Sequence, residues 1–217
     1  MSKPSTLYLF LYNSLQAYGW GISLVKILSN LVETKSITGA YASAGELICL
    51  LQTLAILETI HGAIGIVPSG VLMPLLQWGG RTHVLVAVAH GIKEVQEFSA
   101  VFIMLVSFCS IEVIRYSNYA LNCFNMSPYF LTYLRYTAFI ALFPIGVISE
   151  MWLMYEALPF IKKKNIYAKL FAGLPFSYSD FVTVLLCVYP FLWLLLFVHM
   201  FKQRRSKLGK RHRKKRN

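Results

Sequence analysis

Charged side chains are scarce in this sequence. Of its 217 residues only 14% are Asp, Glu, Lys or Arg, whereas a soluble domain carries about a quarter. Hydrophobic residues make up 57% of the chain, and the mean hydropathy is +0.57. The core of a chain this short cannot bury so much apolar surface, so lipid must cover much of it. The composition excludes an ordinary soluble globular protein.

Cysteine is also sparse, and its spacing matches no known framework. The sequence has no Cys-x-x-Cys and no Cys/His ligand spacing, so we expect neither a zinc site nor a disulfide framework. We also expect no cleavable signal peptide, because the first apolar segment is too long and has no small-residue cleavage site. We interpret the cysteines as small buried apolar residues; they are Cys49, Cys109, Cys123 and Cys187.

Long apolar runs predict an all-α fold, a polytopic membrane bundle of about six transmembrane helices. A membrane-spanning helix needs about 20 mostly apolar residues, and helices satisfy their own backbone hydrogen bonds in lipid. Gly and Pro mark nearly every break between the runs. The predicted helices lie near 7–29, 45–67, 72–91, 98–117, 130–157 and 178–201. We expect one membrane bundle over 1–201.

The formal net charge of +12 comes mostly from the end of the chain. Ten of the 21 Lys and Arg residues lie between Lys202 and Arg216. Such a run is typical of a solvated, disordered tail, so we predict a disordered cytosolic tail over 202–217. We expect its contacts to be anionic lipid headgroups. Nucleic acid is not expected as a partner, because no aromatic or fold motif accompanies the charge.

Orientation follows from this tail. Lys and Arg concentrate on the cytosolic side of membrane proteins, and an even number of spans places the N-terminus there too. Lys162, Lys163 and Lys164 would then face the lumen, which disagrees with the rule. The last four residues, 214–217, match the dilysine retrieval pattern, an address that is read from the cytosol.

Ionisable residues inside the predicted spans need a reason, because each costs about 3 kcal/mol on insertion scales. They either hold helices together or line a polar cavity, and their spread over four helices favours the cavity. Glu112 and Arg115 lie three apart on one helical face and can neutralise each other. The full set is Glu58, His61, Arg81, Glu112, Arg115, Arg135 and Glu150.

Glu150 is the most informative of these residues. No basic residue lies three or four positions from it, so we expect an isolated, protonated carboxyl that can exchange a proton with a ligand. Phe143 lies seven positions earlier on the same helical face, about 10 Å away along the axis. Pro144 and Gly146 lie between them, so we predict a bend that leaves room between Phe143 and Glu150.

Two short motifs suggest other chemistry, and we discount both. The span from Cys109 to Arg115 matches the Cys-x5-Arg of cysteine phosphatases, but it has no glycine and reads as helix rather than as a phosphate loop. Glu58 and His61 match half of a di-iron ligand pair, but the second Glu-x-x-His is missing. We expect no metal and no cofactor.

A series of short motifs carries a resemblance over nearly the whole chain. The chain resembles the very-long-chain (3R)-3-hydroxyacyl-CoA dehydratases, also called protein-tyrosine-phosphatase-like or PTPLA proteins. Each motif alone is weak, but the series in this order is specific. The motifs are Leu11-Tyr12-Asn13, Gly19-Trp20, Glu58-Thr-Ile-His61-Gly62, Gln77 with Arg81, Ile111-Glu112-Val-Ile-Arg115-Tyr116, Leu134-Arg135-Tyr136 and Phe143-Pro144-Ile145-Gly146-Val-Ile-Ser149-Glu150.

The resemblance implies a lyase of the endoplasmic reticulum membrane with six spans. Members of the family remove water from 3-hydroxyacyl-CoA to give trans-2-enoyl-CoA, the third step of the cycle that elongates very-long-chain fatty acids. The implied partners are the acyl-CoA substrate, membrane lipid and the other elongase subunits, namely the condensing enzyme and the two reductases.

The resemblance also implies a site. The family pairs a catalytic tyrosine with a glutamate seven residues later, and Glu150 matches the glutamate, whereas Phe143 stands at the tyrosine position. A tryptophan of the family is also replaced in the fourth span, where Phe108 and Cys109 stand. The supporting or substrate-binding positions that the resemblance implies are Arg81, Glu112, Arg115, Arg135, Gly146 and Ser149.

Two functions remain open from the sequence. The first is a dehydratase in which Glu150 acts with bound water or another hydroxyl group. The second is a catalytically impaired paralogue that regulates or scaffolds the elongase complex, which the loss of the hydroxyl at Phe143 favours. Retention of the other matched polar positions favours the enzyme. A transporter is disfavoured, because the sequence has no inverted repeat.

Overall fold

Every regular element in the described part of the chain is helical, which confirms the all-α prediction. The computed structural model describes residues 3–68 and 70–214, with side chains through Leu208. The elements are α1 (Lys3–Thr34), α2 (Ala40–Leu54), α3 (Ile56–Ala63), α4 (Leu72–Thr82), the π-helix η1 (His83–His90), the 3-10 helix η2 (Lys93–Val95), α5 (Ser99–Asn122), α6 (Tyr129–Arg135), α7 (Phe139–Lys164), α8 (Ala168–Phe171) and α9 (Tyr178–Lys214).

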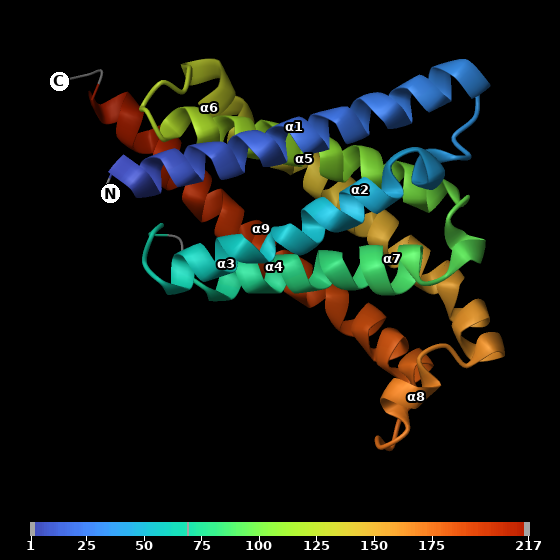
Figure 1. Cartoon of the computed structure of the whole chain (residues 1–217). Helices are drawn as coiled ribbons and strands as arrows, with labels where there is room; N and C mark the ends of the chain where they lie inside the picture. The colour runs from blue at the N-terminus through green and yellow to red at the C-terminus, as the bar shows by residue number, and fades with distance from the viewer. Residues whose placement is uncertain (1–2, 69, 215–217) are drawn as a thin grey trace.

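The helices form an elongated bundle, and both ends of the described chain lie at the same end of it (Figure 1). We call this the termini end. α1 leads away from it, and α2 with α3 returns. α4 and η1 lead away again, and α5 returns to α6. α7 then leads to α8 at the opposite end, from which α9 comes back.

α5 lies at the centre of the bundle. It packs against α1, α2, α6 and α7, and its side chains Met104, Leu105 and Phe108 are fully buried. Because lipid is as apolar as the core, helices in a membrane associate through close packing more than through the hydrophobic effect. Gly19 of α1 illustrates this, since a Cβ there would lie 2.7 Å from Leu51 Cδ2 of α2. The small residue lets the two helices approach.

Four stretches of the described chain are long and apolar enough to cross a membrane. They confirm a multi-pass membrane bundle, whereas the count of about six spans stays a prediction. α1 and α4 with η1 also run along the bundle but carry more polar side chains. In α1 the polar residues Asn13, Gln16 and Ser23 are buried against other helices. The four stretches are Ala40–Ala63, Ser99–Asn122, Tyr129–Lys164 and Tyr178–Leu208.

Two predicted helices are divided in the structure. The helix expected over 45–67 becomes α2 and α3, which meet at Ala55. The helix expected over 130–157 becomes α6 and α7, because the amide of Tyr136 bonds the carbonyls of both Thr132 and Tyr133 and thereby tightens the last turn of α6. Arg135 therefore ends a short helix and does not begin a long one.

The tail differs from its expectation where the structure describes it. We predicted disorder from residue 202, whereas α9 continues as a helix to Lys214. Lys, Arg and Gln are good helix formers, and the apolar part of α9 supplies a formed helix that they extend. The dilysine pattern over 214–217 lies outside the described residues, apart from the backbone of Lys214.

The lysines that disagree with the orientation rule lie at the end opposite the tail. They end α7, where α8 follows (Figure 1). Lys164 forms an ion pair with Glu94 of η2, and this hydrogen bond holds the pKa of Glu94 below its usual value. Glu97 accepts a hydrogen bond from the Gly39 amide at the same end. Acidic groups thus offset part of the lysine charge there.

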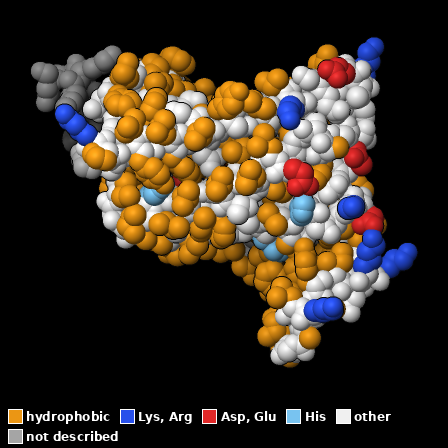
Figure 2. All heavy atoms as spheres, in the orientation of Figure 1, with side chains coloured by type: hydrophobic (Ala, Val, Ile, Leu, Met, Phe, Trp, Pro, Cys, Tyr) orange, Lys and Arg blue, Asp and Glu red, His pale blue; other side chains and the backbone are white. Residues whose placement is uncertain are grey.

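Hydrophobic side chains cover the middle of the face that Figure 2 shows, and charged side chains lie mainly toward its ends. This pattern is typical of a bundle whose belt contacts lipid and whose ends contact water. Exposed apolar residues of α9 extend this apolar belt, among them Val184, Val188 and Phe191.

This arrangement predicts that Arg205 and Ala172 lie on opposite sides of the membrane. In a variant without native cysteines, a membrane-impermeant maleimide applied to sealed vesicles should label only one of Arg205→Cys and Ala172→Cys. Both should react after the vesicles are permeabilised, which controls for accessibility. Labelling of both in intact vesicles would contradict the arrangement.

Candidate active site

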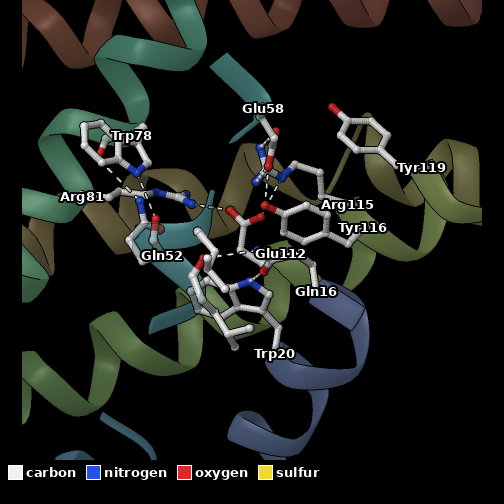
Figure 3. A network of polar contacts seen from close by, with 12 residues as sticks. Gln16, Trp20, Gln52, Glu58, Trp78, Arg81, Glu112, Arg115, Tyr116 and Tyr119 are labelled. Atoms are coloured by element: carbon white, nitrogen blue, oxygen red, sulfur yellow. Dashed lines mark hydrogen bonds and ion pairs between the residues drawn. The ribbon is translucent and has the colours of Figure 1, made fainter. Parts of the chain in front are cut away.

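A chain of buried ion pairs crosses the centre of the bundle (Figure 3). Arg115 of α5 lies in its middle and binds two carboxylates. Its Nε donates to Glu112 Oε2 at 2.6 Å, and its Nη1 and Nη2 donate to Glu58 Oε2 and Oε1 at 3.0 and 2.8 Å. Paired donors of this kind match the fork geometry of a carboxylate. Helices α3 and α5 are thereby tied together through charge.

Arg81 extends the chain to α4. Its Nη1 donates to Glu112 Oε1, so Glu112 accepts from two arginines. The Arg81 guanidinium lies 4.5 Å from the ring centroid of Phe108. Phe108 lies in the stretch with Cys109 where the resemblance predicts a missing tryptophan, and it offers an aromatic face to the cation.

Tyr116 closes the other end of the chain. Its hydroxyl donates to Glu58 Oε1, and its ring centroid lies 4.6 Å from the Arg115 guanidinium carbon. Both carboxylate oxygens of Glu58 thus accept hydrogen bonds from side chains of α5. His61, three residues later, bonds the Tyr8 hydroxyl at 2.9 Å instead. Glu58 and His61 thus bond different side chains.

The spacing of Glu112 and Arg115 predicted part of this network. The pair is in contact as expected, because residues three apart share a helical face. The expectation that they mainly neutralise each other is incomplete, since each binds a further charge from another helix.

A cavity of about 750 Å³ lies beside this network and toward the termini end. Glu58, Glu112 and Arg115 line its inner part, and Phe143 of α7 is also in its wall. Arg135 and the α9 residues His199 and Lys207 line its outer part. Apolar side chains and many polar ones line the wall together, and ligand sites combine the two.

Glu150 lies two turns beyond Phe143 on the same face of α7, and it is 3% exposed. Phe143 lines the cavity, whereas Glu150 is not among the described residues that line it. Its carboxyl is not isolated as predicted, because the hydroxyl of Tyr189 on α9 donates to Glu150 Oε2. Arg81 is close enough for its charge to act on Glu150 as well. Both partners come from other helices.

α7 and α9 pack antiparallel along this part of the site. Phe143 stacks on Phe197, with ring centroids 6.0 Å apart and an interplanar angle of 12°. Seven residues further along α7, Glu150 meets Tyr189, which lies eight residues back along α9. Position 143 therefore faces an aromatic ring of α9, and position 150 faces a hydroxyl.

Gly146 and Ser149 contact helices and are not among the described residues that line the cavity. A Cβ at Gly146 would lie 3.6 Å from the Phe108 ring, so this glycine faces α5, and a small side chain would fit there in ordinary contact. The Ser149 hydroxyl donates to the Gly146 carbonyl at 2.6 Å, within its own helix. The bend and the room expected between Phe143 and Glu150 stay a prediction.

Arg135 keeps one donor unused. Its Nη2 donates to the Tyr119 hydroxyl at 3.1 Å, but its buried Nε has no hydrogen-bond partner within the described chain. A buried donor without a partner is costly and marks a place where a ligand acceptor can bind. Arg135 lines the cavity through other atoms, because its Nε is buried.

The charges of the site balance. Arg81, Arg115 and Arg135 face three carboxyl groups, and Arg135 acts on Glu58 and Glu112 through its charge. Glu112 and Glu58 are paired with Arg81 and Arg115, and Arg81 also acts on Glu150 through its charge. A buried set of this kind carries no net charge when all six groups are ionised, which limits its cost in an apolar bundle.

Tyr189 is the site residue that the sequence did not reveal. It stands in the apolar stretch Val188-Tyr189-Pro190 of the last predicted span. A signal was present, because a tyrosine hydroxyl inside a membrane span requires a hydrogen-bond partner. The sequence cannot say which helix supplies that partner.

Comparison with known proteins gives a consistent set of relatives. A family model described as protein tyrosine phosphatase-like protein, PTPLA, matches residues 52–210. No solved structure matches the chain.

Three curated mouse proteins illustrate the similarity. Very-long-chain (3R)-3-hydroxyacyl-CoA dehydratase 2 of Mus musculus is 35% identical over 211 residues, which cover 94% of this chain and 82% of the relative. Dehydratase 1 of the same organism is 32% identical and covers 94% of this chain and 74% of the relative. Dehydratase 3 is 32% identical over 98% of this chain and 62% of the relative.

Arg115 should be a determinant of stability. Arg115→Met leaves Glu58 and Glu112 buried without their shared counter-charge, so we expect the free energy of unfolding to fall by about 3–5 kcal/mol. Reversible unfolding by SDS in mixed micelles measures this. Lys169→Met, at an exposed lysine of α8, is the matched control. Equal losses for the two variants would show that the ion pairs do not stabilise the bundle.

Proposed function

Because the chain belongs to the protein tyrosine phosphatase-like (PTPLA) family of very-long-chain 3-hydroxyacyl-CoA dehydratases, we propose that it removes water from a (3R)-3-hydroxyacyl-CoA. The product is the trans-2-enoyl-CoA. The observation that carries this proposal is the Glu150 carboxyl, buried two turns beyond the cavity wall and held by a tyrosine hydroxyl.

The reaction needs one group to take a proton and another to give one. A base removes the proton from Cα, and its electron pair forms the Cα=Cβ double bond. The Cβ–O bond then breaks, and an acid protonates the departing hydroxyl to give water. A carboxyl group hydrogen-bonded to a phenol supplies both kinds of group at one place.

The cavity suits an acyl-CoA in two respects. Its apolar wall accepts the acyl chain within the bundle, and its outer part carries Arg135 and Lys207, which suit the CoA phosphates. The thioester then lies between this basic mouth and the inner polar groups.

Location and partners follow from the family and from the tail. We propose that the protein lies in the endoplasmic reticulum membrane with both termini in the cytosol, since the basic residues beyond 202 follow the last span. The cavity then opens toward the cytosol, where CoA esters are available. The proposed partners are the condensing enzyme and the two reductases of the elongation cycle.

One observation favours a second function. Phe143 contributes a ring but no proton at the position of the family's tyrosine, and it packs flat against Phe197. An impaired paralogue that binds hydroxyacyl-CoA or elongase subunits would not need the missing hydroxyl. Co-purification with the condensing enzyme and the reductases is expected if it scaffolds the complex.

An assay of purified protein with 3-hydroxyacyl-CoA separates these functions. Wild type should form enoyl-CoA, and Glu150→Gln or Glu150→Ala should lower the rate about 10²–10⁴-fold, because each removes a positioned acid–base group. Glu156→Gln, a nearby substitution on the same helix, is the control. A wild-type rate no higher than that of Glu150→Ala would end the dehydratase proposal for the native chain.

Arg135 should matter for binding and not for chemistry. Arg135→Gln should raise the KM for hydroxyacyl-CoA about 10- to 100-fold at unchanged kcat, since it removes a charge-assisted hydrogen bond. The KM for a hydroxyacyl-pantetheine, which lacks the nucleotide phosphates, should not change. An equal rise for both substrates would place Arg135 away from the phosphates. Lys169→Gln, at the opposite end, is the control.

A further inference from the structure

We propose that Tyr189 is a catalytic residue and supplies the phenol hydroxyl that Phe143 lacks. This inference rests on the proposed dehydratase function and identifies the partner of Glu150. The site would then keep a tyrosine–glutamate pair, but its two members come from different helices, α9 and α7.

The first support is the contact itself. The Tyr189 hydroxyl donates to Glu150 Oε2 across the packed face of α7 and α9, and Tyr189 is only 7% exposed. Glu150 Oε1 has no hydrogen-bond partner among the residues that the structure describes. One carboxyl oxygen is therefore held by the phenol, and the other is not engaged by a described side chain.

The second support is the setting of the pair. α4 lies directly behind the hydroxyl, since a Cβ at Gly80 would be 3.4 Å from Tyr189 Oη. Arg81 follows Gly80 and acts on both Glu150 and Tyr189 through its charge. The same arginine is fixed by Glu112. The pair is thus held from three helices, as a catalytic pair must be to react in a defined geometry.

The third support is the environment of Phe143. Its ring lies flat on Phe197, which in turn stacks on Trp193 at 5.1 Å. Phe143 offers no hydrogen bond to the buried Trp193 Nε1, which has no partner among the described residues, and the position forms an apolar part of the cavity wall. The proton-bearing group lies further in, at the level of Glu150.

The pair completes a balanced elimination. Glu150 Oε1 takes the proton from Cα, the C–H electron pair forms the double bond, and the Cβ–O bond breaks. Tyr189 gives its proton to the departing hydroxyl, which leaves as water. The carboxyl group then rotates so that its protonated oxygen faces the Tyr189 phenolate, and the proton passes from Glu150 to Tyr189. The starting state is restored without a proton from solvent, and no further reactant is required.

Tyr189→Phe tests this directly in the full-length protein. We expect kcat for hydroxyacyl-CoA to fall about 10²–10⁴-fold with unchanged KM, because the variant removes an acid and no part of the cavity wall. Tyr155→Phe is the matched control, since Tyr155 lies on α7 and is 67% exposed. Thermal melting of each variant in detergent checks that it folds.

A rescue separates catalysis from packing. Phe143→Tyr returns a hydroxyl to the same face of α7, so the double variant Phe143→Tyr/Tyr189→Phe should regain most of the lost kcat. A loss in Tyr189→Phe that Phe143→Tyr does not restore would mean that Tyr189 only packs, and it would overturn the inference. Activity of Tyr189→Phe equal to that of Tyr155→Phe would overturn it too, while leaving the dehydratase function intact.

The remaining outcomes distinguish the inference from the function on which it rests. If wild type is inactive and Phe143→Tyr alone is active, the family reaction fits the site but Tyr189 does not supply the hydroxyl. If wild type and Phe143→Tyr are both inactive, the proposed function fails and the inference fails with it.

Discussion

Buried charge is the constraint on which this structure depends. In an apolar bundle an unpaired arginine or glutamate costs several kcal/mol, so each must reach a partner. Arg115 meets Glu58 and Glu112, and Arg81 meets Glu112, which joins α3, α4 and α5 at one level. Rotating or sliding any of these helices would leave a charge without its partner. The ion pairs therefore set the register of the bundle, while close packing fills the space around it.

The same constraint builds the site. Glu112 and Arg115 both bond across helices and line the cavity, so one network supports the fold and gives the cavity its polar inner wall. Arg81 connects that network with the Glu150–Tyr189 pair. A polar group placed by several helices at once moves little, which suits proton transfer at a fixed position. Stability and chemistry thus draw on the same few side chains.

The sequence predicted many of the helices and one contact of the site. The predictions that were wrong share a cause, because they concern hydrogen bonds and contacts that hydropathy does not report. Apolar runs and Gly/Pro breaks predicted the helices, and the three-residue spacing predicted the contact of Glu112 with Arg115. Local hydropathy did not reveal the turn after Arg135, because that turn depends on backbone hydrogen bonds within a largely apolar stretch. Local hydropathy also predicted no partner for Glu150, because Tyr189 and Arg81 lie on other helices.

The sequence by itself determined that the chain is an all-helical membrane protein of a dehydratase family, because periodicity, span length and motif order are properties of the linear chain. Through the resemblance it also predicted that Phe143 stands where the family has a tyrosine. Only the tertiary structure decided which charges pair, where the cavity lies and that Tyr189 faces Glu150. Those facts depend on how separate helices pack, and that is a matter of distances between residues far apart in the chain.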